Sequence, residues 1–186
     1  GDDVIAGGSG LNTVSYADIS AAVTVDLTVT VSQNTVGAGL DRILSCSTLV
    51  GGSGSDRLYG NTAANLIQGG AGGDTLVGSD GADKLTGGRG ADRFTYFDAE
   101  ESTFIAEDTI SDFRRSDGDR IDLRFIDADL TTDGIQKFSF ATNGIVSLGK
   151  IVFLNGEFLG DVDGDGAADL AVNVIGVTLT GADFLF

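Results

Sequence analysis

The chain has no histidine, proline, methionine or tryptophan, and it has a single cysteine. Without histidine it cannot build a histidine-ligated zinc site, nor a catalytic unit in which histidine activates serine or cysteine. Cys46 cannot form a disulfide within the chain, and we interpret it as a small buried hydrophobic residue. No run of about 20 apolar residues is present, so no segment is predicted to span a membrane.

Basic residues are also scarce. Lys and Arg number 11 against 28 Asp and Glu, and the resulting charge of −17 argues against nucleic acid or an anionic membrane surface as the main partner. The acids are 24 Asp and only 4 Glu, and 29 of the 186 residues are Gly. Asp and Gly favour turns, while a hydrophobic content of 41% argues against disorder. The composition therefore predicts an ordered chain with many tight turns that carry carboxylates.

A nine-residue repeat runs through the first half of the chain. Each copy has a glycine-rich beginning, Asp or Asn at the sixth position and a large apolar residue at the eighth. The tandem copies are GGSGSDRLY (51–59), GNTAANLIQ (60–68), GGAGGDTLV (69–77), GSDGADKLT (78–86) and GGRGADRFT (87–95). Two more are GGSGLNTVS (7–15) and VGAGLDRIL (36–44). The pattern G-G-x-G-x-D-x-U-x, with U a large apolar residue, is typical of the calcium-binding repeat of RTX proteins.

The spacing of the repeat predicts a parallel β-roll. Each copy supplies a turn, in which Gly permits a positive φ, and then a three-residue strand with its central side chain pointing inward. Two copies make one coil, so residues 18 apart stack at about 4.8 Å. Leu58, Leu76 and Phe94 are expected to form one inward column, and Ile67 and Leu85 the facing one.

The same stacking predicts metal sites between the turns. Asp side chains about 5 Å apart repel one another, and carboxylates combined with backbone carbonyls suit Ca²⁺ better than Mg²⁺ or Zn²⁺. The alternative is that these turns are solvated and bind no metal, but the tandem repetition of the nonapeptide disfavours it. One predicted ladder holds Asp41, Asp56, Asp74 and Asp92; the other holds Asn65 and Asp83, and is closed by Asp98, Glu101 or Asp108. About five to seven ions are expected, and the neutral Asn12 and Asn65 should give weaker or shared sites. The predicted ligands are Gly8, Gly10, Asn12, Gly37, Gly39, Asp41, Gly52, Gly54, Asp56, Asn65, Gly70, Gly72, Asp74, Gly81, Asp83, Gly88, Gly90, Asp92, Glu101 and Asp108.

Two segments depart from the repeat. Residues 16–36 contain the alternating run SAAVTVDLTVTV, which predicts an irregular strand insert in the roll. Asp18 and Asp26 in this insert are either ligands or surface acids, and we favour surface acids. After residue 95 the period ends, and DTISDF, RIDLRF, KFSF, KIVFL, EFLG and ADLAVNVIG are predicted strands. Asn155-Gly156 between two apolar runs predicts a type I′ hairpin turn.

These features together predict an all-β protein. A parallel β-roll of nonapeptide repeats over residues 1–95 is followed by a sandwich-like antiparallel β cap over residues 96–186. The cap is expected to cover apolar side chains and unpaired backbone groups at the open end of the roll. The absence of methionine and the incomplete repeat GDDVIA (1–6) predict a fragment of a longer protein with an upstream domain.

One further acidic cluster lies in the predicted cap. The segment DVDGDGAAD places Asp161, Asp163, Asp165 and Asp169 at positions 1, 3, 5 and 9 of an EF-hand-like loop. Position 12 is Val172 instead of Glu, and the flanking segments are predicted strands, not helices. A weak calcium site and a plain Asp-Gly hairpin turn are equally consistent with this pattern.

The tandem repeats, followed by RFTYF, DTISDF, DGDRIDL and a terminal ADFLF, resemble the C-terminal module of RTX proteins exported by type I secretion. The serralysin-type metallopeptidase C-terminal module is the nearest likeness, and mannuronan epimerase R-modules are similar. The resemblance implies a secreted, extracellular bacterial protein whose partner is the type I secretion machinery. It also implies that Asp183–Phe186 is an uncleaved export signal, or else only a core strand. The serralysin zinc motif is absent, so this chain is not expected to be an enzyme.

Two functions remain open from the sequence. The first is a calcium-binding module that drives folding after export and stabilises a larger secreted enzyme. The second is a module that binds an anionic polysaccharide or builds a surface layer. Arg42, Arg57, Lys84 and Arg93 occupy the seventh position of their repeats and are candidates to line a glycan-binding face.

Overall fold

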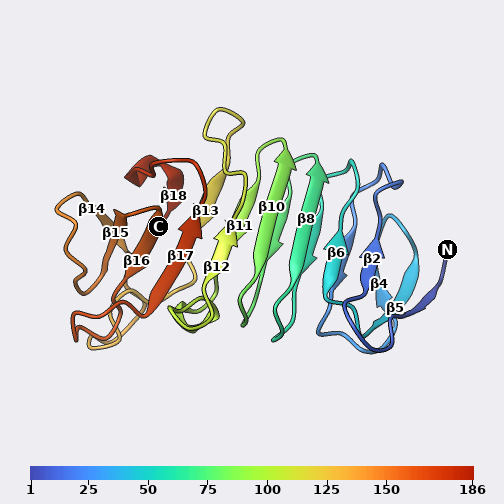
Figure 1. Cartoon of the computed structure of the whole chain (residues 1–186), viewed down its shortest axis with the longest axis horizontal. Coiled ribbons are helices and arrows are strands. Elements are labelled where there is room, and N and C mark those ends of the chain that lie inside the picture. The colour runs from blue at the N-terminus through green and yellow to red at the C-terminus, as the bar shows by residue number, and fades with distance from the viewer.

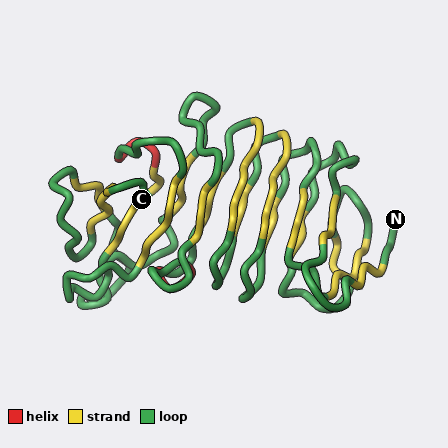
Figure 2. The backbone as a smooth tube through the Cα atoms, viewed as in Figure 1, coloured by secondary structure: helices red, strands yellow, loops and turns green.

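The computed structural model describes all 186 residues, and nearly all its regular structure is β-strand. Strands lie side by side along the long axis of the molecule, with the N-terminus at one end and β14–β18 at the other (Figure 1). Short strands are joined at both edges by turns (Figure 2). The only helices are two 3₁₀ turns, η1 (Ala99–Glu101) and η2 (Gly181–Asp183). Neither is long and apolar enough to cross a bilayer.

Two long sheets face each other. The nine-stranded sheet contains, in spatial order, β14 (Ser139–Ala141), β15 (Lys150–Leu154), β16 (Glu157–Gly160), β17 (Leu170–Val174), β12 (Asp108–Ile110), β10 (Lys84–Arg89), β8 (Leu66–Ala71), β6 (Thr48–Val50) and β2 (Thr13–Ser15). The six-stranded sheet contains β18 (Phe184–Leu185), β13 (Arg120–Asp122), β11 (Arg93–Thr95), β9 (Thr75–Val77), β7 (Arg57–Tyr59) and β3 (Thr24–Asp26). Strands β6 to β13 alternate between the two sheets along the chain, so each coil contributes one strand to each sheet.

The pairing confirms the predicted parallel roll and its inward columns. Leu58 pairs with Leu76 and Leu76 with Phe94 in one sheet, while Ile67 pairs with Leu85 in the other. All five side chains are fully buried between the sheets. Burial of each such side chain stabilises the fold by about 1.5–3 kcal/mol. The residue at the eighth position of the repeat therefore packs in the core, while the residue at the sixth position lies on the turn.

The N-terminal segment forms a small third sheet, in the order β1 (Val4–Ala6), β5 (Leu40–Leu44) and β4 (Gln33–Asn34). The predicted insert at 16–36 divides in two. Its first part provides β3, which joins the six-stranded sheet beside β7, and its second part turns back so that β4 pairs antiparallel with β5. The alternating burial holds at Val23, Val25 and Leu27 and ends there, because Val31 is exposed.

The prediction of an antiparallel cap over 96–186 is wrong in its extent. Strand β12 is parallel to β10 and to β17, and β13 is parallel to β11 and to β18, so both sheets continue past residue 95 without a break. Antiparallel pairing in this half is confined to β15, β16 and β17. The roll continues because Asp108-Thr109-Ile110 and Asp119-Arg120-Ile121 keep the Asp and the inward apolar residue of the repeat. Their turns lack its glycine pattern, which hid the extra coil.

The β15–β16 hairpin agrees with its sequence signal. Leu154 pairs with Glu157, so Asn155 and Gly156 form a two-residue turn, and both have positive φ, of 55° and 99°. A type I′ turn requires positive φ at both positions, and its twist matches that of the flanking strands.

Candidate metal sites on the turns of the roll

The residue that precedes each strand of the roll lies on a turn, and equivalent residues of successive coils stack. In the six-stranded sheet Arg57, Thr75, Arg93 and Arg120 are in register. The residues before them therefore form a first ladder of Asp56, Asp74, Asp92 and Asp119. The same argument in the nine-stranded sheet gives a second ladder of Asn12, Ser47, Asn65, Asp83 and Asp108.

Within each ladder the backbone of one coil bonds to the carboxylate of the next. The N–H groups of Asp56, Asp74 and Asp92 donate to Oδ1 of Asp74, Asp92 and Asp119, at 2.8, 2.9 and 3.0 Å. In the second ladder the N–H groups of Asn65 and Asp83 donate to Oδ1 of Asp83 and Asp108, at 2.6 and 2.8 Å. These bonds fix the position of each carboxylate and occupy only one of its two oxygens.

The second oxygen is the unusual feature of the site. Oδ2 of Asp74, Asp83, Asp92 and Asp108 is buried and has no hydrogen-bond partner. The four residues are at most 2% exposed. A buried carboxylate oxygen without a partner carries a large desolvation cost unless a cation compensates it. The unpartnered carboxylate oxygens at these turns therefore require a bound cation.

Carboxylate and carbonyl oxygens crowd these turns and leave no room for a side chain at the glycines. A Cβ on Gly69 would collide with Oδ2 of Asp74 and lie 2.6 Å from the carbonyl oxygen of Gly87 on the next coil. Gly51, Gly78 and Gly87 are crowded in the same way by the Asp of their own repeat. Several carbonyls and a carboxylate converging at flexible geometry are the ligands of Ca²⁺. The residues at these turns fit that ion.

Burial shifts the titration of the ladder carboxyls. Loss of hydration raises the pKa of Asp74 and of Asp83 to about 7, that of Asp92 to about 6 and that of Asp108 to about 8. Neighbouring carboxylates raise these pKa values further, while bonds from backbone N–H groups oppose the shift. A divalent cation between the coils would reverse this penalty, because the deprotonated form is then the stabilised one.

The C-terminal end of the second ladder gathers four buried oxygen-bearing side chains, those of Asp83, Tyr96, Glu101 and Asp108. Of the three residues predicted to close it, Asp108 occupies the ladder position itself. Glu101 lies close enough to raise the pKa of Asp83, and Asp98 caps η1 through the N–H of Glu100 at 3.1 Å. The phenol oxygen of Tyr96 is also buried here, and its interaction with Asp108 lowers the pKa of that carboxyl, against the larger rise caused by burial.

The predicted place of Asp41 in the first ladder is wrong. Val23 precedes the strand beside β7, and its N–H donates to Oδ1 of Asp56 at 2.8 Å. Asp41 lies instead beside Asp3, because β5 pairs with β1. Its carboxylate accepts bonds from the N–H of Asp3 at 3.1 Å and from the hydroxyls of Tyr16 and Thr35 at 3.0 and 2.9 Å. The site predicted between 36–41, with Gly37 and Gly39, and the 51–56 turn is therefore not formed.

Two of the three neutral residues of the second ladder, Asn12 and Asn65, bond within their own turns, whereas Oγ of Ser47 is buried without a hydrogen-bond partner. The side-chain amide of Asn12 donates to the carbonyls of Gly8, Gly10 and Ser45, at 3.4, 3.1 and 3.1 Å. Oδ1 of Asn65 accepts from the N–H of Asn61 at 2.7 Å, and its amide donates to Ser47 at 3.4 Å. An amide that donates to these carbonyls competes with a cation for them, so a calcium site at Gly8, Gly10 and Asn12 stays a prediction.

Sequence reasoning missed Asp119 and Asp112. Asp119 is 2% exposed and ends the first ladder, and Asp112 accepts from the N–H groups of Gly87 and Gly88, both at 2.9 Å. A signal for Asp119 was present, because Asp-Arg followed by a large apolar residue occurs at 56–58, 92–94 and 119–121. The signal was obscured because residues 112–118 contain only one glycine.

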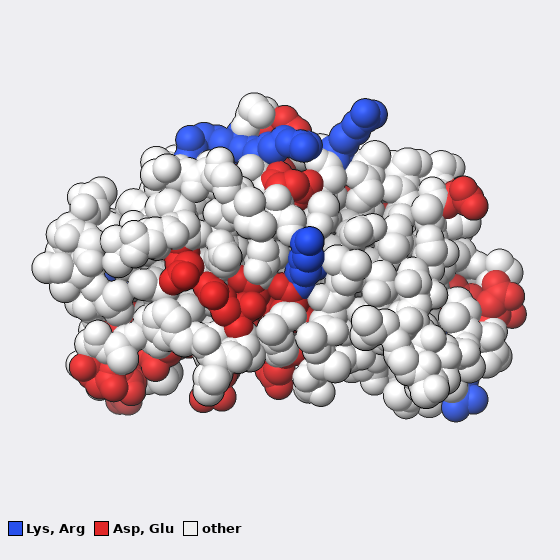
Figure 3. Space-filling model, in the orientation of Figure 1, with Lys and Arg blue, Asp and Glu red and all other residues white.

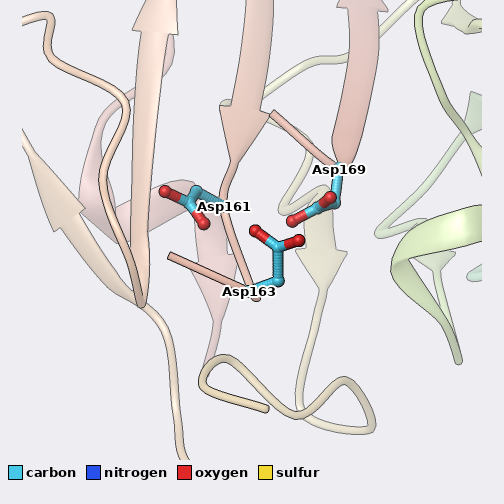
Figure 4. Close-up of side chains that lie close together, drawn as sticks. All are labelled: Asp161, Asp163 and Asp169. Atoms are coloured by element: carbon cyan, nitrogen blue, oxygen red, sulfur yellow. The ribbon is translucent and has the colours of Figure 1, made fainter. Parts of the chain in front are cut away.

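The acidic loop between β16 and β17 brings three of its four predicted residues together. The carboxylates of Asp163 and Asp169 point toward each other beside Asp161 (Figure 4), and one oxygen of each of the three residues lies within 4.8 Å of the others, while Asp165 is outside the group. Asp161 is fully buried, and its oxygens accept from the N–H groups of Gly164 and Gly166 at 2.7 and 3.1 Å. These bonds complete a hairpin turn, and a calcium site here stays a prediction.

The charges are unevenly distributed over the surface. On the face shown in Figure 3, acidic side chains gather across the middle and basic ones lie mainly along the upper edge. A separate row of arginines, Arg57, Arg93 and Arg120, accompanies the first ladder, with Thr75 in register between the first two. They line a groove of about 270 Å³ together with Asp74 and Asp92.

A parallel roll whose turns present stacked, unpartnered Asp oxygens defines a calcium-binding β-roll of the RTX class. Comparison with protein families agrees with this class. The family described as Peptidase M10 serralysin C terminal matches residues 9–186, and the RTX calcium-binding nonapeptide repeat matches residues 1–15. The chain belongs to the serralysin C-terminal family. It is thus a C-terminal calcium-binding module and not a catalytic domain.

A solved structure supports the same fold. The chain is similar to the AlgE6R3 subunit of the Azotobacter vinelandii mannuronan C5-epimerase, with 26% sequence identity and a TM-score of 0.54. The similarity covers 75% of this chain and 77% of the subunit. A search of curated protein sequences finds no match. The likeness to both serralysin modules and epimerase R-modules that the repeats indicated is thereby confirmed.

Proposed function

We propose that this chain makes the folding of a larger exported protein conditional on calcium. The observation that carries the proposal is the set of buried, unpartnered Oδ2 atoms on Asp74, Asp83, Asp92 and Asp108. Without a cation these atoms oppose folding, and with Ca²⁺ they become ligands that join one coil to the next. The binding free energy of the ions then becomes folding free energy.

The ladders support five sites between coils. Three lie between successive members of the first ladder, from Asp56 to Asp119, and two lie between Asn65, Asp83 and Asp108. Five divalent ions supply a charge of about +10 against the −17 of the chain, which relieves most of its self-repulsion. Glu101 supplies a further oxygen to the last site of the second ladder, and backbone carbonyls of the glycine-rich turns complete each one.

The test is a comparison of circular dichroism in chelator, in millimolar calcium and in millimolar magnesium. The β signal is expected only with calcium, since Mg²⁺ demands a more rigid octahedral geometry. An equal β signal in chelator and in calcium would show that the chain folds without metal.

Export through a type I channel explains why such conditional folding is useful. Bacterial cytosol holds little free calcium, and extracellular calcium modules bind in the range of about 10⁻⁴–10⁻³ M. The chain then stays unfolded in the cell and folds outside, where it stabilises the secreted protein to which it is joined.

The last four residues have two states in this scheme. In the folded chain Phe184 is buried in β18 beside β13, and Asp183 is bound by Arg115. In the unfolded chain the same residues are exposed and available to the exporter. Deletion of Asp183–Phe186 is expected to abolish secretion from a cell with the matching exporter, and normal secretion of the truncated chain would leave only a structural role.

A second candidate function is binding of an anionic polysaccharide. It is favoured by the Arg57, Arg93 and Arg120 row, and by the likeness to a subunit of a mannuronan C5-epimerase. Titration of the calcium-loaded chain with mannuronate oligomers tests it, with Arg93→Gln as the variant and Arg89→Gln, on the other sheet, as the control. Weaker binding only for Arg93→Gln supports the function, and no binding to the native chain rules it out.

A further inference from the structure

A second groove lies beside the C-terminal end of the second ladder, among the loops that follow β11, β13 and β16. It has a volume of about 260 Å³ and is lined mostly by apolar side chains. Ile126 and Val162 are nearly buried at its base, whereas Phe97, Phe125, Leu130 and Ile135 are between 44% and 75% exposed. Exposed apolar side chains that gather around a concavity mark interaction sites, unlike single exposed ones.

The groove is held in place by its surroundings and does not collapse on itself. The rings of Phe97 and Phe125 lie 4.9 Å apart at an angle of 44°. The N–H of Leu130 donates to the carbonyl of Val162 at 2.8 Å, which ties the 127–136 loop to the end of β16. Asp127 closes this loop, because its Oδ1 accepts from the N–H groups of Asp129 and Gln136, at 3.1 and 3.0 Å.

The charge at the groove has one sign. Asp98 and Asp127 line it, and Asp129 and Asp133 lie in the loop that provides Leu130 and Ile135. None of these four carboxylates forms a salt bridge. The guanidinium nearest to the rings is that of Arg124, 5.9 Å from the Phe125 centroid, and it is already engaged by Asp122 at 2.8 and 2.7 Å. An occupant must therefore bring both an apolar group and positive charge.

We propose that this groove docks a segment of a partner polypeptide that inserts one large apolar side chain flanked by Lys or Arg. The size favours a single side chain over a separate small molecule, since small-molecule sites usually measure about 300–1,000 Å³. An anionic membrane surface is disfavoured by the acidic residues. A second copy of the chain is disfavoured because the groove is acidic and the chain of −17 stays net negative even with the charge of about +10 from five calcium ions.

The test is a nuclear magnetic resonance titration of the full chain, labelled with ¹⁵N and saturated with calcium. The probe is the peptide acetyl-Lys-Phe-Lys-amide, compared with acetyl-Glu-Phe-Glu-amide and acetyl-Lys-Ala-Lys-amide. The first peptide is expected to shift the amide signals of Phe97, Phe125 and Leu130, with at least about threefold higher affinity than the other two. Its affinity should fall as salt is added, because the attraction to the carboxylates is screened.

Matched variants separate docking from a general change in the fold. Leu130→Ser should lower the affinity for the Lys-Phe-Lys peptide by at least about fivefold. Ile145→Ser is the control, because Ile145 is 61% exposed, as Leu130 is 64%, and does not line the groove. Asp127→Asn keeps the oxygen that closes the loop and should remove much of the preference for the basic peptide.

Three outcomes overturn the proposal. One is the absence of localised shifts at about 10 mM peptide, which excludes even weak docking. Another is equal binding of the acidic and basic peptides. The third is dimerisation. If the molecular mass doubles as the protein concentration rises, and the amide signals of the groove shift without peptide, the occupant is a second copy of the chain.

Discussion

The two ends of the roll use the same turn position in different ways. Toward the N-terminus the second ladder holds Asn12, Ser47 and Asn65, and the two Asn side chains there bond to neighbouring carbonyls and amides. Toward the C-terminus it holds Asp83 and Asp108, each with a buried oxygen that has no partner. The strands are parallel and in register at both ends, so the backbone is not what distinguishes them.

This difference indicates which coils of the roll depend on calcium for their stability and which do not. An Asn amide both accepts and donates, so it can saturate a turn without metal. A carboxylate only accepts, so beside carbonyls it needs a cation. We infer that the N-terminal coils need less calcium than the coils from Asp56 to Asp119, which depend on it. Asp41 also belongs to the part that needs less calcium, because its carboxylate accepts hydrogen bonds from two hydroxyls and one backbone N–H.

The largest expected effect is a difference in hydrogen exchange along a calcium titration. At calcium concentrations below saturation, amides of β9, β11 and β13 should lose protection by at least about tenfold more than those of β2 and β6. The cause is the unpartnered carboxylates of the charged coils. Equal calcium dependence at both ends would show that the roll folds as one unit and that the comparison does not describe its stability.

The next effect concerns single residues. Asp74→Ala removes a ligand shared by two sites and should raise the calcium concentration at the midpoint of folding several-fold. Asp41→Ala should leave this midpoint nearly unchanged, and should instead lower stability at saturating calcium by about 1–3 kcal/mol, because three donors lose their acceptor. If the two variants shift the midpoint equally, Asp41 is a calcium ligand after all.

The sequence predicted those parts of the roll in which the spacing of residues alone determines the structure. A nine-residue period fixes the turn, the strand and the inward column, so Leu58, Leu76 and Phe94 stack as expected. It could not reveal that Val23 takes the place given to Asp41, because this depends on how residues 16–36 fold back on β5. The extra coil at Asp108 and Asp119 was missed because Asp-x-apolar triplets are common, and the glycines that make them specific are absent there.

The dependence of folding on pH is a third way to separate the two ends. In the metal-free chain the folded-state pKa values of Asp74, Asp83, Asp92 and Asp108 are about 6 to 8, against about 3.9 when unfolded. The folded state thus binds more protons, so this contribution to stability is fully present below about pH 4 and is lost as the pH rises through 6 to 8. Without calcium, β structure should therefore increase on acidification from pH 8 to pH 5.

Calcium reverses this pH dependence. Its binding requires deprotonated carboxylates, so the calcium midpoint should rise as the pH falls over the same range. Circular dichroism at several pH values, with and without calcium, measures both trends. In the variant Asp74→Asn the metal-free chain should lose part of its pH dependence, and an unchanged profile would mean that this carboxyl does not titrate on folding.

The smallest expected effect is at the C-terminus, where the charged end of the roll is closed. Nε and a terminal nitrogen of Arg115 donate to the two oxygens of the fully buried Asp183, at 2.6 and 2.5 Å, and the same guanidinium donates to the carbonyl of Thr178 at 3.1 Å. Arg114 donates from its side chain to Gly88 and from its N–H to Asp119. Two adjacent arginines thus join the last turn of the first ladder to the strand that holds Phe184.

Arg115→Gln should release this strand without unfolding the roll. In saturating calcium the variant is expected to lose its last residues to carboxypeptidase several-fold faster than the native chain, since local opening governs cleavage. Arg124→Gln is the matched control, because Arg124 makes a similar two-bond pair with Asp122, which lies in β13 and not in the C-terminal segment. Equal trimming of the two variants would mean that the aromatic contacts of Phe184 with Phe140 and Phe158, and not the ion pair, keep the C-terminus in place.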